Sequence, residues 1–146
     1  MSGSESALPP PGLGRRLAAI SYDALLLTAI LLFAAIPFVL LAHGAPATTP
    51  VRFLFQFYLL SIIALFYCGF WVHGGQTLGM RAWRLRLVRA GGGSVGWQQA
   101  LLRFFAALLS WAALGAGFLW ILVDRDRCAW HDRLSGTRLI LLPKEN

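Results

Sequence analysis

Two long stretches of the chain contain no charged residue, and they restrict the possible folds more than any other feature of the sequence. Ala24–Ala42 is a run of 19 uncharged residues, and Phe53–Val72 is a second uncharged run. A helix needs about 20 apolar residues to cross the hydrocarbon core of a bilayer. The sequence therefore predicts two transmembrane helices. The first begins near Leu13–Leu17, and the turn-rich segment His43–Arg52 separates it from the second.

The composition agrees with a membrane protein of one domain. The chain has 146 residues, of which 58% are hydrophobic and 13% charged, whereas a soluble domain carries about 25% charged residues. Two cysteines are too few for a disulfide scaffold. The net charge is +7, but the arginines cluster between the apolar blocks. We interpret them as topology signals and contacts with anionic lipid, and we expect no nucleic-acid partner.

A third apolar block, Phe104–Val123, allows two topologies. If it crosses the membrane as a straight helix, seven basic residues lie inside and six outside. If it folds back at Gly115–Gly117, twelve lie inside and only Arg52 lies outside. The positive-inside rule favours the fold-back. We therefore expect two full spans and a broken, re-entrant hairpin, with three straight transmembrane helices as the alternative.

Two short segments outside the apolar blocks predict a small β element. Met80–Arg89 alternates between apolar and basic residues, the period of a strand. Arg138–Leu142 is a short apolar run that can pair with it if both lie on the cytoplasmic side. The glycine-rich segment Gly74–Gly79 predicts a sharp turn, in which Gln76 and Thr77 are expected to cap a helix. The predicted fold is an all-α membrane protein with a cytoplasmic two-stranded β element.

Asp23 is the most informative single residue because it lies inside the first apolar segment. Carboxylates at such positions usually pair, take up a proton or line a wet path. Arg16 is seven residues earlier, so both residues share one helix face about 10 Å apart. Polar residues of the second span (Gln56, Ser61 and Tyr67) are candidate hydrogen-bond partners. Asp23 either binds a proton or cation, or it holds the helix pair together.

A second polar cluster follows the third apolar block. Asp124, Asp126, His131 and Asp132 alternate there with three arginines. A metal site needs three or four convergent ligands, and a single histidine makes one implausible. The cluster is either a salt-bridged interfacial segment, or it brings Asp124 or Asp132 to Arg15 or Arg16 and closes a cytoplasmic gate. The chain also lacks the residue sets of an enzyme or a cofactor site, so we expect neither catalysis nor a cofactor.

Three ordered blocks resemble the RDD family of bacterial membrane proteins. They are RRLAAISYD at Arg15–Asp23, GGQTLGMRAWRLRLV at Gly74–Val88 and GFLWILVDRDRCAWHDRLSGT at Gly117–Thr137. The resemblance implies a membrane domain over residues 12–143, between an N-terminal tail (1–11) and a short C-terminal tail (144–146). The residues that would carry over from the family name are one arginine (Arg16, or else Arg15) and two aspartates (Asp23, and Asp132 or Asp124).

The resemblance also implies a function and a location. Transport of small ligands is proposed for the family, and some members are credited with sodium/proton antiport. On this hypothesis Asp23 alternately binds a proton and a cation, with Arg16 easing proton release. Two spans and a hairpin enclose no complete path, so a homo-oligomer or another membrane protein is expected as a partner, besides the lipid bilayer. The expected location is the bacterial inner membrane, with both termini cytoplasmic. The alternative is a scaffold or assembly factor with a basic cytoplasmic docking face.

Overall fold

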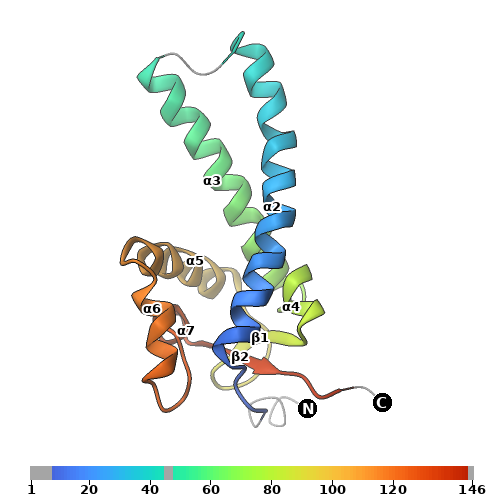
Figure 1. The fold of residues 1–146 in the computed structure, drawn as a ribbon, viewed down its shortest axis with the longest axis vertical. Coiled ribbons are helices and arrows are strands. Elements are labelled where there is room, and N and C mark those ends of the chain that lie inside the picture. Colours follow the sequence, from blue (N-terminus) through green and yellow to red (C-terminus); the bar gives the residue numbers. More distant parts are fainter. Residues whose placement is uncertain (1–7, 45–47, 145–146) are drawn as a thin grey trace.

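The computed structural model describes residues 8–44 and 48–144 and consists of two long helices that rise from a smaller base (Figure 1). Helix α2 spans Leu13–Leu41 and helix α3 spans Thr49–Val72. Both are long and apolar enough to cross a membrane. The two predicted apolar helices are therefore confirmed, and α3 begins four residues before the uncharged run does.

The third apolar block forms two helical pieces that meet at a sharp bend. Helix α5 spans Trp97–Ala112, and the short helix α6 (Ala116–Leu119) continues into a 3-10 turn, η1 (Trp120–Leu122). The pieces are inclined by 103°. Leu114 and Gly115 make the bend, with φ angles of 56° and 78°, a left-handed conformation that glycine adopts without strain. The break predicted at Gly115–Gly117 is confirmed, and a straight third helix is excluded.

The base contains the two-stranded sheet and two short helices. Strand β1 (Leu85–Arg89) pairs antiparallel with β2 (Thr137–Leu141), with Leu87 opposite Leu139. Helix α4 (Leu78–Ala82) precedes β1, and α7 (Trp130–Ser135) precedes β2. The predicted pairing of the two segments is confirmed.

The prediction of a strand from Met80 onward was wrong at its start. Residues Leu78–Ala82 are helical, and the hydroxyl of Thr77 accepts a hydrogen bond from the amide of Met80 at 3.2 Å. Such a cap satisfies one of the free amides at a helix start and so favours a helix over an extended chain. The capping role expected for Thr77 is thereby confirmed.

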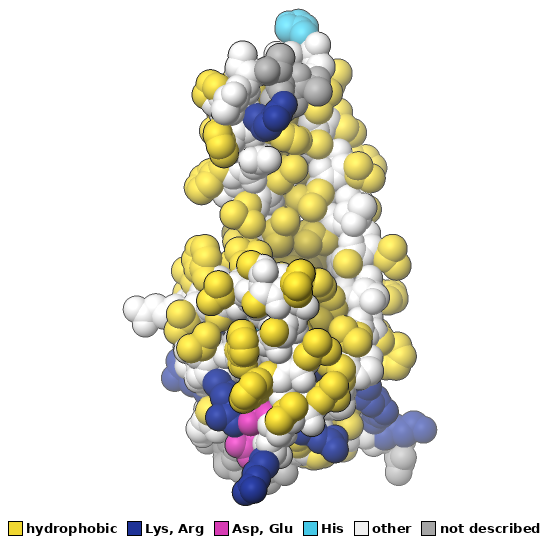
Figure 2. Space-filling view, turned by 60° about the vertical axis from the view of Figure 1, so that its left-hand side comes forward, with side chains coloured by type: hydrophobic (Ala, Val, Ile, Leu, Met, Phe, Trp, Pro, Cys, Tyr) yellow, Lys and Arg dark blue, Asp and Glu magenta, His cyan; other side chains and the backbone are white. Residues whose placement is uncertain are grey.

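The buried core lies in the base, and the long helices expose their apolar side chains. Leu85, Leu87, Ala100, Phe104 and Leu139 belong to one buried cluster. By contrast, only 6% of the 18-residue apolar stretch of α2 is buried, and the same fraction holds for α3. Hydrophobic side chains cover the long helices, whereas most Lys and Arg side chains gather at the base (Figure 2). The surface of α2 and α3 therefore suits an apolar environment.

Helix α4 approaches α2 so closely that their backbones touch. A Cβ atom at Gly79 would overlap the carbonyl oxygen of Ala19 and press on the side chain of Asp23. Glycine at this position therefore permits the contact between the two helices. Nothing lies within 4 Å of a Cβ atom placed at Gly74, five residues earlier.

We expect Gly79→Ala to destabilise the fold by about 1–3 kcal/mol, because the added methyl group must push α4 away from α2. Gly74→Ala is the matched control, since its methyl group meets open space. Thermal unfolding of both variants in detergent micelles checks the prediction. Equal unfolding midpoints for the two variants would contradict the close packing.

Candidate functional site

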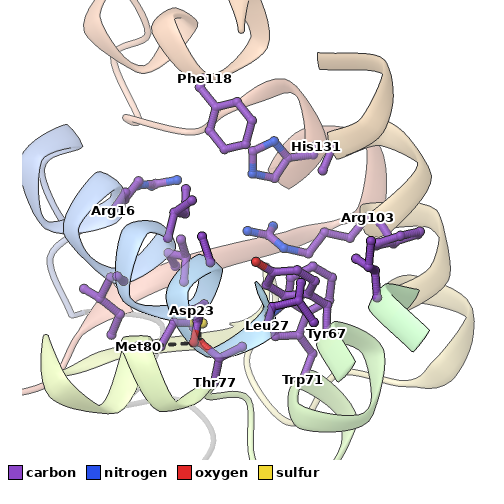
Figure 3. Close-up of a pocket in the computed structure, with 18 of the residues that line it drawn as sticks. Arg16, Asp23, Leu27, Tyr67, Trp71, Thr77, Met80, Arg103, Phe118 and His131 are labelled. Atoms are coloured by element: carbon purple, nitrogen blue, oxygen red, sulfur yellow. Dashed lines mark hydrogen bonds between the residues drawn. The ribbon is translucent and has the colours of Figure 1, made fainter. Parts of the chain in front are cut away.

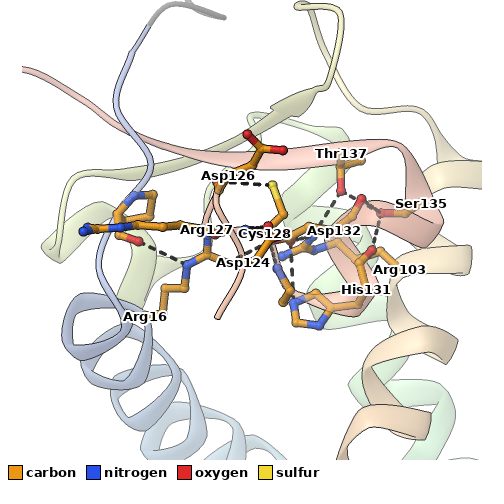
Figure 4. Close-up of polar contacts among 12 residues, drawn as sticks. Arg16, Arg103, Asp124, Asp126, Arg127, Cys128, His131, Asp132, Ser135 and Thr137 are labelled. Carbon is orange, nitrogen blue, oxygen red and sulfur yellow. Dashed lines mark hydrogen bonds and ion pairs between the residues drawn. The ribbon is translucent and has the colours of Figure 1, made fainter. Parts of the chain in front are cut away.

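A buried ion cluster joins three elements that are far apart in the sequence (Figure 4). Nη1 of Arg16, in the first turn of α2, lies 2.8 Å from Oδ2 of Asp132 on α7. Nη1 of Arg103, on α5, pairs with the other carboxylate oxygen, Oδ1. Arg16 is 3% exposed, Arg103 is 4% exposed and Asp132 is 0% exposed. One carboxylate thus ties α2 and α5 to α7.

Backbone and hydroxyl groups complete the hydrogen bonding of the cluster. Arg16 also donates to the carbonyl oxygen of Arg127 at 2.8 Å, and Arg103 donates to the hydroxyl of Thr137 at 3.0 Å. Oδ2 of Asp132 accepts the amide of Ala129 at 3.0 Å, at the start of α7. Buried charges are stable only with such partners, so the loss of one member of the cluster would leave the others without a partner.

Burial and the neighbouring arginines together set the protonation states of Asp132 and His131. Burial alone would raise the pKa of Asp132, but Arg103, with His131 and Arg16, holds that pKa well below its usual range. Burial and the positive charge of Arg103 lower the pKa of His131 to about 3. At neutral pH, Asp132 is therefore ionised and the His131 ring is neutral.

The structure selects between the residues that sequence reasoning left open. Arg16 makes the contact with Asp132, and Arg15 lies outside the cluster. Asp124 instead pairs with Arg133 and accepts the amide of Cys128 at 2.9 Å. The expected approach of an aspartate in the tail to an arginine of the first helix therefore occurs between Asp132 and Arg16.

Asp23 forms a separate site on the same face of α2, about two turns beyond Arg16. Its Oδ1 accepts the amide of Gly79 at 2.8 Å, and its Oδ2 pairs with the hydroxyl of Thr77. The carboxylate is only 2% exposed. The hydrogen bonds come from Thr77 and Gly79 at the start of α4. The expected partners in α3, which were Gln56, Ser61 and Tyr67, were therefore wrong.

Arg16 was expected to ease proton release from Asp23 through its positive charge, and this influence stays a prediction. Both residues are buried on the same face of α2, as their spacing predicts. The long side chain of Arg16, however, reaches Asp132 and the carbonyl of Arg127. A direct Arg16–Asp23 ion pair is not formed, because the guanidinium is committed to the cluster at the base.

A cavity of about 320 Å³ lies between α2, α3 and α5 and connects the two polar sites (Figure 3). Arg16, Asp23, Arg103 and His131 line its polar part, and aliphatic and aromatic side chains form the remaining wall. The Arg103 guanidinium lies 5.1 Å from the centre of the Trp71 ring, a distance at which a cation interacts favourably with an aromatic face.

Sequence reasoning missed two members of this arrangement. Arg103 was counted only as a topology charge, although it is the sole charged residue of α5. A lone charge in an otherwise uncharged helix is a usable signal that the side chain has a buried partner. The amide of Gly79 was missed as well, because every residue except proline carries a backbone amide and the sequence does not show which one is used.

Within residues 8–44 and 48–144, no group of three or more His, Cys, Asp or Glu side chains is placed to hold a metal ion.

The neutral state of His131 predicts a pH dependence of stability. An unfolded histidine titrates near 6.5, but this one titrates at about 3 in the fold. Below about pH 6 the unfolded chain binds a proton that the folded chain does not, so stability falls as the pH falls. Asp132 behaves differently: its stabilising contribution is complete above its ordinary pKa of 3.8 and is lost only below it.

We therefore expect the folding equilibrium constant in micelles to fall by up to tenfold per pH unit between about pH 6.5 and pH 4.5. The midpoint of thermal unfolding should drop over the same range. His131→Gln should flatten this slope. His43→Asn, at the exposed far end of α2, is the control and should keep it. A slope in His131→Gln as steep as that of the unmodified chain would contradict the assignment.

The comparison with family models agrees with this arrangement of residues. The model of the RDD family matches residues 10–136, which include Arg16, Asp23, Arg103 and Asp132. No curated protein and no solved structure matches the chain. The match covers most of the 146 residues, and the apolar helices α2 and α3 fit a membrane protein. The chain belongs to the RDD family.

Proposed function

We propose that the chain is a multi-pass protein of the bacterial inner membrane, with α2 and α3 as full spans, a re-entrant α5–α6 pair and both termini in the cytoplasm. The distribution of charge supports this topology. Arg52 lies at the start of α3, beside the connection to α2, and the other basic residues belong to the base and its flanking segments. The positive-inside rule then assigns the base to the cytoplasmic side.

We further propose transport by proton/cation exchange at Asp23, and one observation carries this proposal. Asp23 is a buried carboxylate on the wall of the cavity between α2, α3 and α5. Its partner Thr77 can donate a hydrogen bond to the carboxylate, or accept one from the protonated acid. Carboxylate and hydroxyl oxygens are also suitable ligands for hard cations. The pair is therefore chemically suited to hold a proton or a small cation in turn.

A complete transport path requires more protein than one chain supplies. The exposed apolar faces of α2 and α3 include Leu32, Phe33, Phe53 and Phe57, each more than half exposed. Such faces contact lipid or the helices of a neighbour. We propose that a second copy of the chain, or another membrane protein, completes the path.

Proton exchange in everted membrane vesicles tests the proposal. We expect Na⁺, K⁺ or Li⁺ to dequench a pH-sensitive dye in vesicles that contain the unmodified protein, and Asp23→Asn to abolish this response. The amide keeps the size of the side chain but cannot exchange a proton. Asp126→Asn is the matched control, because Asp126 is a largely exposed carboxylate outside the cavity.

The same vesicles check the orientation. Everted vesicles expose their cytoplasmic face, so protease should remove a tag fused to the C-terminus without detergent. A tag that is protected until detergent is added would contradict the proposed topology. Loss of the cation response in Asp126→Asn, at equal membrane levels, would contradict the specific role of Asp23.

A second function, that of a membrane scaffold or assembly factor, is favoured by the hydrogen bonds of Asp23 itself. Bonds to Thr77 and to the Gly79 amide would also serve simply to fasten α4 to α2. In that case the Arg and Lys side chains at the base of the fold would dock a cytoplasmic partner. Correctly inserted protein that gives no response to any of the three cations would favour this second function.

A further inference from the structure

We propose that the cavity between α2, α3 and α5 binds an uncharged amphiphile of the monoacylglycerol class, with its hydroxyl- and carbonyl-bearing head among Arg103 and His131. This inference goes beyond ion exchange. It rests on the proposed membrane insertion, which supplies such ligands, but not on the role proposed for Asp23. Three properties of the cavity support it: its shape, its unsatisfied hydrogen-bonding atoms and its charge.

The cavity is apolar and exposed at one end and polar and buried at the other. Ala24, Leu108 and Trp111 line it and are themselves exposed. Arg103 and His131 line it as well, and both side chains are at least nine-tenths buried. Figure 3 shows them on the side of the cavity opposite the Asp23–Thr77 pair. A ligand that matches this change in polarity along the cavity has an acyl chain at the open end and a polar group at the buried end.

Two polar atoms at the buried end lack a hydrogen-bond partner. They are Nε of Arg103 and Nδ1 of His131. Nε of arginine is only a donor. We assign the single ring proton of neutral His131 to Nε2, because Nε2 faces the Asp132 carboxylate at 3.6 Å, so Nδ1 is left as an acceptor. The buried end therefore lacks one acceptor and one donor, which the ester carbonyl and a glycerol hydroxyl of a monoacylglycerol supply together.

The charges around the cavity as a whole are balanced when Asp23 is ionised. Arg16, Arg103 and Asp23 line it, and Asp132 pairs with both guanidinium groups, so two positive charges stand against two negative ones. A carboxylate or phosphate head would bring an additional charge into a desolvated site at high cost. Uptake of a proton or cation at Asp23 changes the balance by one charge, but it leaves the unpaired atoms of Arg103 and His131 as they are. An uncharged head therefore fits better than an anionic one.

Fluorescence quenching tests the proposal on the full chain in lipid nanodiscs. Trp71 and Trp111 line the cavity, so a brominated monooleoylglycerol bound there should quench tryptophan emission saturably. We expect brominated oleate, above its pKa, and brominated lysophosphatidylglycerol to bind at least about tenfold more weakly. These two probes carry the same acyl chain on a carboxylate and on a phosphate head.

Two variants locate the binding. Ala107→Phe places a ring in the cavity, since Ala107 lines it, and should weaken binding by about tenfold or more. Ala112→Phe adds the same ring to an exposed position of α5 outside the lining and should leave binding unchanged. His131→Phe keeps an aromatic ring against Phe118 but removes the acceptor for the hydroxyl, and should weaken the binding of monooleoylglycerol.

Several results would overturn the proposal. Quenching that does not saturate, or that is equal in Ala107→Phe and Ala112→Phe, would indicate contact at the lipid-facing surface only. Binding of oleate or lysophosphatidylglycerol as tight as that of monooleoylglycerol would exclude selection of an uncharged head. A chain that does not enter the nanodiscs at all would contradict the membrane insertion on which both proposals rest.

Discussion

The carboxylate of Asp132, buried between the guanidinium groups of Arg16 and Arg103, is the interaction on which the rest of the structure depends. Its two partners lie 116 and 29 residues away along the chain. Removing one member of a buried pair leaves an uncompensated charge, which costs about 3–5 kcal/mol. The cluster therefore fixes the start of α2, the middle of α5 and helix α7 in a single arrangement.

This arrangement explains why the two long helices can rise with so little packing between them. The buried residues of α2 are Arg16, Ala19, Asp23 and Leu27, which fall on one face of its lower part. Arg16 fastens that face to α7, and Asp23 fastens it to the start of α4. The remaining surface of α2 stays apolar and exposed, as a helix that contacts lipid requires. The cavity lies where α2, α3 and α5 diverge above these two attachments.

The sequence was sufficient for the features that depend on local pattern and on charge distribution. The uncharged runs located α2 and α3, because the length of such a run decides whether it can cross a bilayer. The alternation in β1 and the apolar run of β2 located the sheet. The bend at Gly115 followed from glycine together with the count of basic residues on each side of the membrane.

The sequence was insufficient where the partner is distant or belongs to the backbone. Spacing placed Arg16 near Asp23, but the length of the arginine side chain lets it reach Asp132 instead. Asp23 takes its hydrogen bonds from Thr77 and from the amide of Gly79, and their proximity results from the tertiary fold. The start of β1 was misplaced because a five-residue capped helix, α4, fits inside an alternating pattern.

A double-mutant cycle on Arg16 and Asp132 tests the central role of the buried cluster most directly. The free energy of unfolding would be measured in micelles for Arg16→Met, Asp132→Leu and the double variant. Both variants that lack Asp132 lose its contact with Arg103, so this loss cancels and the cycle isolates the Arg16–Asp132 pair. We expect each single change to be strongly destabilising, and the double variant to lose at least about 1 kcal/mol less than the sum of the two losses. Strictly additive losses would contradict a direct coupling between α2 and α7.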